Sequence, residues 1–294
     1  MPTPLRPITA IGFIGLGVMG EPMCGHLARR SGLAVTAHDR LREPLERLAA
    51  AGVASLPPAE MAAHCDLILL SLPDGQAVQD VLAEIEPRLR PGQIVVDTST
   101  SPVEMTRAIG ARLATVGVAF ADAPIARTRE AASRGELSIM VGAEASVFAH
   151  IRAMLETMGT DVTHCGPVGS GQVVKILNNM LLFQNVCALA EAIAVARRNG
   201  VSPEILLSTV AKGSGDSFAL RNHGIKAMLP NDYPPRAFST RYAIKDLSYA
   251  LEMAEAAGLT LDGAELTMRR LRQAEADGHG DAYFPALRHV IDPP

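Results

Sequence analysis

Short apolar runs alternate with segments of helical spacing over residues 9–165. Most runs are continuously apolar rather than alternating with polar residues, as in strands that are covered on both faces of a sheet. Strands are expected at residues 10–14, 34–38, 67–72, 94–97, 119–122, 138–141 and 161–163. Helical spacing lies between them, for example over residues 77–85 and 102–116. This alternation predicts an α/β fold with a doubly wound sheet.

The strand pattern stops at Gly166-Pro167, and the rest of the chain is helical in pattern. Helices are expected over residues 169–200, 202–212, 237–257, 261–278 and 283–289. The first of these would span roughly 40 Å at about 1.5 Å per residue. It is apolar on nearly every face, which predicts burial on most sides. The pattern therefore indicates an α/β domain over residues 1–167 and an all-α domain over residues 168–294, joined through this long helix.

Composition narrows the classes of partner. The 294 residues carry a net charge of −4, with 4% aromatic residues and no Trp, so nothing indicates a nucleic-acid surface. The four cysteines are scattered without metal-ligand spacing, which favours reduced thiols in a cytoplasmic protein without a metal site. Polar residues interrupt the long helix at positions 175, 178, 179, 184 and 185, which argues against a membrane span.

A glycine-rich loop follows the first expected strand and opens a helix. Gly15, Gly17 and Gly20 form GxGxxG, with Val18 and Met19 between the last two glycines. Such glycines allow a tight turn, close approach of the backbone to a pyrophosphate, and close packing of the helix on the sheet. The N-terminus of the following helix would face the phosphates. This arrangement predicts a dinucleotide-binding Rossmann domain.

The residues after the second expected strand bear on the choice of cofactor. Asp39 lies 19 positions after Gly20, where an acidic side chain binds the adenosine ribose hydroxyls, and this favours NAD. Arg40 and Arg42 follow, and an arginine here could hold the 2′-phosphate of NADP or stack on adenine. Either arginine could equally belong to a solvated helix start.

Four motifs in order along the chain resemble the β-hydroxyacid dehydrogenase family, which includes 3-hydroxyisobutyrate dehydrogenase and tartronate semialdehyde reductase. GFIGLGVMGEPM (residues 12–23) is similar to the family's cofactor motif, and DAPIARTREAASRGELSIMVGA (122–143) to its substrate motif. GSGQVVKILNNML (169–181) resembles its catalytic motif, and KDLSYA (245–250) its C-terminal motif. The resemblance covers essentially the whole chain and implies a Rossmann domain followed by a helical domain like that of 6-phosphogluconate dehydrogenase.

The resemblance implies that Lys175 is catalytic and exchanges a proton with the substrate oxygen. Burial among apolar neighbours on its helix should lower the pKa of this lysine toward neutrality, because burial disfavours the charged form. Asn179, one turn further on, would orient Lys175 or bind the substrate. Alternatively, Lys175 reaches the surface from a packing helix.

Further contacts are implied by the same resemblance. Leu72, Pro73, Thr100, Phe238 and Lys245 would contact the cofactor, while Ser99 and Asp246 would contact the substrate. The alternatives are that Phe238 belongs to the core and that Lys245 and Asp246 form a surface ion pair of little energetic value.

The substrate motif departs from the family at Ala126-Arg127-Thr128, where the usual pattern is Ser-Gly-Gly. An Arg-Thr pair here resembles the branch that reduces sulfolactaldehyde. A guanidinium presents a planar fork suited to carboxylate, sulfonate or phosphate, so Arg127 and Thr128 are expected to hold an anionic substrate. The alternative is that Arg127 faces solvent or pairs with Glu130.

The sequence thus predicts an oxidoreductase that moves a hydride between NAD, with NADP as the rival, and a small β-hydroxyacid or its semialdehyde. An imine reductase is the first alternative, and Lys175 argues against it because related imine reductases usually lack this lysine. A cofactor-bound binding module without catalysis is the second. By analogy with the family, the chain is expected to form a homodimer or homotetramer.

Overall fold

The computed structural model describes residues 3–235 and 237–293. Its contacts divide the chain into two compact units, Met1–Lys175 and Ile176–Pro294. The division falls inside the long helix α8 (Ser170–Arg198), so that the first turns of this helix belong to the first unit. The boundary between residues 167 and 168 stays a prediction.

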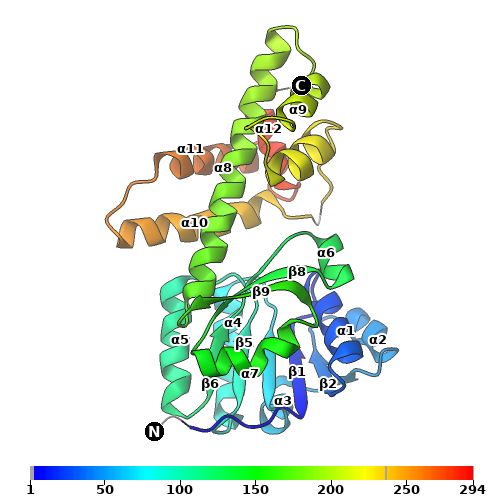
Figure 1. The fold of residues 1–294 in the computed structure, drawn as a ribbon, viewed down its shortest axis with the longest axis vertical. Coiled ribbons are helices and arrows are strands. Elements are labelled where there is room, and N and C mark those ends of the chain that lie inside the picture. Colours follow the sequence, from blue (N-terminus) through cyan, green and yellow to red (C-terminus); the bar gives the residue numbers. More distant parts are fainter. Residues whose placement is uncertain (1–2, 236, 294) are drawn as a thin grey trace. The chain divides into compact units, whose positions relative to one another are not determined.

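The first unit is built on one mixed sheet (Figure 1). Its strands are β1 (Ala10–Ile14), β2 (Ala34–His38), β3 (Ala54–Ser55), β4 (Leu67–Leu70), β5 (Ile94–Asp97), β6 (Ala119–Asp122), β7 (Ile125–Ala126), β8 (Leu137–Gly142) and β9 (Gly159–Gly166). The order is β3-β2-β1-β4-β5-β6-β8-β7, and β9 pairs with β8. The first six strands are parallel, whereas β8 runs antiparallel to β6 and β7. This confirms the predicted Rossmann-type sheet, whose chain order reverses beside β1.

Helices of the first unit are α1 (Gly20–Arg30), α2 (Arg42–Ala49), α3 (Pro58–His64), α4 (Gly75–Ile85), α5 (Val103–Thr115), α6 (Arg129–Arg134) and α7 (Ala145–Leu155), with a 3-10 turn η1 (Glu86–Arg88) after α4.

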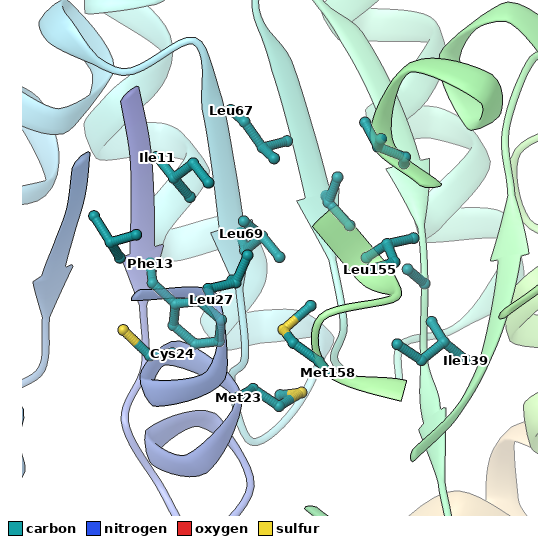
Figure 2. Close-up of a cluster of buried hydrophobic side chains, with 14 of the residues drawn as sticks. Ile11, Phe13, Met23, Cys24, Leu27, Leu67, Leu69, Ile139, Leu155 and Met158 are labelled. Carbon is teal, nitrogen blue, oxygen red and sulfur yellow. The ribbon is translucent and has the colours of Figure 1, made fainter. Parts of the chain in front are cut away.

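Two hydrophobic clusters explain why the strands are continuously apolar. Ile11 and Phe13 of β1 pack with Met23 and Leu27 of α1 (Figure 2). Ile14, next along β1, belongs instead to a cluster with α3, α4 and α5. Successive strand residues point to opposite faces, and both faces are covered.

The second unit is helical. After α8 it contains α9 (Pro203–Val210), the π-helix η2 (Leu220–Met228), α10 (Thr240–Ala256), α11 (Asp262–Ala274), η3 (Glu275–His279), η4 (Phe284–Leu287) and α12 (Arg288–Ile291). Ser202 caps α9 by accepting the Ile205 N–H, which satisfies a donor that the helix itself leaves unpaired. Ser239 caps α10 by accepting the Tyr242 N–H. Helix α10 therefore begins at Thr240, three residues after the predicted start at residue 237.

Helix α8 differs from the prediction in one respect. Its inner side is buried, with Phe183 packed on Phe284 at a centroid distance of 5.2 Å. On its outer side, however, Leu181 is 57% exposed and Val195 is 61% exposed. By length and composition alone, α8 could cross a membrane, but the core helix of a water-soluble protein can be equally long and apolar, and half of the most apolar part of α8 is buried within the structure.

Candidate functional site

The loops that carry the predicted cofactor residues leave the same edge of the sheet. The glycine loop follows β1, Asp39 follows β2, Leu72 follows β4, and Ser99 follows β5. These four strands are parallel and adjacent, in the order β2-β1-β4-β5. Open α/β sheets bind their ligands at the carboxyl ends of the strands, where the chain order reverses, and here that point lies between β1 and β4.

The three glycines of the loop are constrained by different neighbours. A Cβ on Gly15 would lie 2.2 Å from the Ser71 carbonyl oxygen, and one on Gly20 would lie 2.0 Å from the Gly15 carbonyl oxygen. A Cβ on Gly17 would meet no heavy atom within 4 Å. The fold therefore excludes side chains at Gly15 and Gly20, whereas Gly17 is exposed and presents bare backbone toward open space. Val18, next to it, is also exposed, and Met19 is half-buried. This surface fits a bound pyrophosphate.

Asp39 joins the end of β2 to this loop. Its Oδ2 accepts the Leu16 N–H at 2.5 Å, and its Oδ1 accepts the Leu41 N–H at 2.8 Å. These two bonds hold the carboxylate beside the glycine loop, where a ribose would lie. Arg40 is exposed. Arg42 pairs with Glu46 at 2.9 Å on the surface of α2, which is the placement of a solvated helix start.

The loops after β4 and β5 are joined through a buried serine. Ser99 Oγ accepts the Leu72 N–H at 2.9 Å, and the Ser99 N–H donates to Asp97 Oδ1 at 2.9 Å. Thr100 is half-buried and Pro73 is exposed. Of the predicted cofactor and substrate residues of these two loops, Leu72 and Ser99 are therefore joined directly by a hydrogen bond.

The start of α8 is fixed by two residues that the sequence pattern did not single out. Asp122, at the end of β6, accepts the N–H groups of Gly169 at 2.6 Å and Gln172 at 2.8 Å. Burial raises the pKa of Asp122 to about 6, against the lowering effect of these hydrogen bonds. Gln172 in turn donates to the Ser99 carbonyl at 2.8 Å and accepts the Ser101 N–H at 3.1 Å. Lys175, half-buried, follows three positions later on α8.

Arg127 is engaged within its own unit. Its guanidinium donates to Asp161 Oδ2 at 2.6 Å, to the Glu136 carbonyl at 2.7 Å and to Thr160 Oγ1 at 2.9 Å. The alternative partner considered from the sequence, Glu130, pairs with Arg134 instead. The backbone of Arg127 has φ of 85°, a conformation that favours glycine.

Thr128 is placed as a helix cap. Its hydroxyl accepts the Ala131 N–H at 3.3 Å and so begins α6. Both members of the predicted anion pair thus have partners within the chain. Binding of a substrate anion by Arg127 stays a prediction.

The helical unit brings together the remaining polar residues. Asn179 Nδ2 donates to Asp246 Oδ2 at 2.7 Å, and Lys245 Nζ lies 2.8 Å from Asp246 Oδ1. Lys245 also lies over the rings of Tyr242 and Tyr249, with its Nζ 5.6 Å and 5.0 Å from their centroids. Asp246 is buried, so this pair is not the surface ion pair considered as an alternative. Lys175 and Asn179 share a face of α8 because they are four residues apart.

Phe238 is half-buried among aromatic rings. It packs on Phe183 at 5.7 Å, on Phe284 at 5.6 Å and on Tyr242 at 6.3 Å between centroids. Phe238 therefore packs as part of the aromatic core, and its contact with the nicotinamide stays a prediction. Among residues 3–235 and 237–293, no group of three or more His, Cys, Asp and Glu side chains could hold a metal ion.

Comparisons with known proteins agree with this architecture. Residues 10–166 match the model of the NAD-binding domain of 6-phosphogluconate dehydrogenase. Residues 169–291 match that of the NAD-binding region of NADP-dependent 3-hydroxyisobutyrate dehydrogenase. The chain is 32% identical to 2-(hydroxymethyl)glutarate dehydrogenase of Eubacterium barkeri, over 95% of this chain and 94% of that protein. It is 30% identical to NAD-dependent L-serine dehydrogenase of Pseudomonas aeruginosa, over 96% and 98%.

Among solved structures, 3-hydroxyisobutyrate dehydrogenase of Mycobacterium tuberculosis with L-serine superposes with a TM-score of 0.88 at 31% identity, covering 97% of this chain and 99% of that chain. An imine reductase from a Pseudomonas species has a TM-score of 0.62 at 20% identity, over 96% and 98% of the two chains. The latter likeness shows the fold alone.

Proposed function

The chain belongs to the family of 3-hydroxyisobutyrate dehydrogenase and related hydroxyacid dehydrogenases, and we propose that Lys175 is the general acid and base of its reaction. The family's reaction is a hydride transfer between a nicotinamide dinucleotide and a small hydroxyacid. The observation that carries the proposal is the bonding of Gln172 to the Ser99–Ser101 backbone, because this places the turn of α8 that bears Lys175 beside a cofactor-side loop.

Side chains of the protein must transfer the proton, since the bound nicotinamide dinucleotide would only supply or accept the hydride. During carbonyl reduction, Lys175 would donate a proton to the substrate oxygen as negative charge develops there. During alcohol oxidation, the neutral amine would accept the hydroxyl proton. Asn179 Nδ2 is held by Asp246 Oδ2, which fixes the amide one turn beyond Lys175, where its oxygen would orient the substrate hydroxyl or the lysine.

NAD is the proposed cofactor, with NADP as the rival. Support comes from Asp39, whose carboxylate is held beside the glycine loop by the Leu16 and Leu41 N–H groups. A carboxylate there accepts bonds from ribose hydroxyls and repels a 2′-phosphate. Exposed Arg40 is the residue that would favour NADP.

The proposed substrate is a small β-hydroxyacid or its semialdehyde whose carboxylate or other anionic group is recognised near the turn between β7 and α6. Arg127 and Thr128 are the proposed ligands of this group. The Arg127 guanidinium already holds Asp161, so the substrate anion would share it with a carboxylate of the protein itself.

Substitution of Lys175 tests the proposal. Lys175→Ala should retain binding of NADH, measured by fluorescence titration, while kcat falls by orders of magnitude with small hydroxyacids and their semialdehydes. Lys226→Ala is the control, because Lys226 is an exposed lysine bonded to Asn222. Near-normal turnover in Lys175→Ala would remove the proposed proton transfer. The same assays with NADPH in place of NADH measure the cofactor preference.

We further propose a cytoplasmic homodimer or homotetramer. The support is a stripe on α8 whose members recur at alternating intervals of three and four residues and are all exposed: Asn178, Leu181, Asn185, Ala188, Ala192 and Val195. This spacing keeps one face of a helix in register with a partner helix. Light scattering of the purified protein measures its mass, and a monomer at micromolar concentration would contradict this assembly.

A further inference from the structure

The first turn of α8 cannot cap itself. Gly169, the residue before the helix, has φ of 93° and no side chain to accept a helical N–H group. The N–H groups of a first helical turn have no partner within the helix, and a nearby side-chain oxygen normally accepts one of them. Here the acceptor comes from another element, since Asp122 of β6 binds the N–H groups of Gly169 and Gln172 with its two carboxylate oxygens.

The surroundings of Asp122 are built to admit this carboxylate. A Cβ on Gly142 would lie 2.4 Å from Asp122 Oδ1, and one on Gly171 would lie 2.8 Å from Oδ2. Both positions must therefore be glycine for the carboxylate to reach the helix. Asp122 is itself completely buried. The negative charge also lies at the positive end of the α8 dipole, which is a favourable placement.

Gln172 extends the contact from the helix to the neighbouring loop. Its amide nitrogen donates to the Ser99 carbonyl and its amide oxygen accepts the Ser101 N–H, so both ends of the side chain are used on one loop. Ser101 and Ser99 in turn bind Asp97. The side chain of Gln172 is fully buried. The rotation and the height of the first α8 turn are thus fixed against the β5–α5 loop at several points.

We propose that Asp122 and Gln172 are positioning residues for the reaction, which set the place of Lys175 relative to the loop of Ser99 and Thr100. Lys175 is three residues from Gln172, about 4.5 Å further along the helix axis and on the same face. A proton donor must lie within about 3 Å of the atom that it protonates, so a small rotation of this turn lowers the rate of proton transfer. This inference rests on the proposed role of Lys175.

Asp122→Asn is the principal test. The two N–H groups bind different oxygens of Asp122, and Asn replaces one of these oxygens by an NH2 group. One N–H group then faces a donor, so the first turn should shift without a change of side-chain size. We expect kcat to fall at least tenfold, with the dissociation constant of NADH and the KM of the hydroxyacid changed less than threefold. The solvent deuterium isotope effect on kcat should rise, because proton transfer becomes more rate-limiting.

Asp66→Asn is the matched control. Asp66 Oδ2 also accepts backbone N–H groups, those of Thr9 at 2.9 Å and Ala10 at 3.3 Å, but it precedes β4 at the opposite edge of the sheet. The control should lose stability while keeping kcat and the isotope effect. An equal fall of kcat in both variants would show a general loss of structure and would overturn the proposal, as would an unchanged kcat in Asp122→Asn.

Two substitutions of Gln172 test the positioning role independently if Asp122→Asn does not fold. Gln172→Met keeps the length of the side chain and loses both hydrogen bonds, whereas Gln172→Ala loses the bonds and also leaves a cavity. The fall in kcat should therefore appear in both variants, with NADH binding retained in both, and the larger loss of stability should appear in Gln172→Ala. Wild-type kcat in Gln172→Ala would overturn the inference. If Lys175→Ala also remained active, the proposed function itself would fail. If Lys175→Ala were inactive while Gln172→Ala kept full activity, only the positioning role would be removed.

Discussion

At the scale of single residues, Arg127 departs most from what its position favours. It occupies φ of 85°, where a side chain is strained and glycine is not, while its guanidinium is held by Asp161, Thr160 and the Glu136 carbonyl. The Thr160 hydroxyl and the Arg127 guanidinium lower the pKa of Asp161 below its usual range. This backbone conformation gives a physical reason for the glycine that the family usually has at this position, because glycine adopts a positive φ without strain.

This strain predicts an inverted order of stability between two variants. Arg127→Ala loses the side-chain bonds and keeps the strain, whereas Arg127→Gly loses the bonds and removes the strain. Arg127→Gly should therefore be the more stable of the two by about 1 kcal/mol. Arg112 is the control, since it is also exposed and ion-paired but lies within α5, where Gly should be the less stable by about 1 kcal/mol. Urea unfolding measures all four, and equal stability of the two Arg127 variants would contradict the strain.

At the scale of elements, the sequence predicts those features that are local. Among the strands of the first unit, β1, β4, β5, β6 and β8 lie within a few residues of their predicted bounds, because burial on both faces produces an unbroken apolar run. The two-residue strands β3 and β7 are too short for any period to show, and η2 winds with a period that a helical template does not fit.

The candidate site likewise has local features, which the sequence predicts, and long-range contacts, which it does not. The glycine loop is local and was predicted. The bonds of Asp122 to Gln172 and of Arg127 to Asp161 join residues 50 and 34 positions apart, so their partners become visible only once the sheet is formed.

The glycine loop itself permits a clean separation of folding from binding. Ala at position 17 meets no heavy atom within 4 Å, so Gly17→Ala should fold with a free energy of unfolding within about 1 kcal/mol of wild type. Its methyl group would occupy the surface proposed for the pyrophosphate, and NADH binding should weaken at least tenfold. Gly20→Ala is the comparison, because its Cβ would collide with the Gly15 carbonyl and should impair folding instead. Fluorescence titration and thermal unfolding measure the two effects. Unchanged NADH affinity in Gly17→Ala would place the cofactor elsewhere.

At the scale of the whole molecule, two buried groups in different units respond to pH with opposite signs. Burial raises the pKa of Asp122 to about 6, so its contribution favours the folded state at low pH and is lost as the pH rises through 6. Burial, with a smaller effect of Lys226, lowers the pKa of His223 to about 4. The contribution of His223 is therefore complete above its unfolded value near 6.5 and is lost as the pH falls through 4. Between pH 4 and 6 these contributions offset each other in the intact chain.

Removing His223 should therefore change how stability depends on pH. His223 is 5% exposed and its Nδ1 is bonded to the Tyr283 hydroxyl, which a Gln amide can also engage. At pH 7, His223→Gln should lose on the order of 1–2 kcal/mol of stability through imperfect packing among Phe218, Tyr283 and Phe284. At pH 4.5, wild type has lost about 2–3 kcal/mol at His223 that the variant cannot lose, so the difference should shrink or reverse. His289→Gln is a control for a less buried histidine. Calorimetric unfolding between pH 4.5 and 7 measures the change, and a stability difference independent of pH would show that His223 keeps its ordinary pKa in the folded chain.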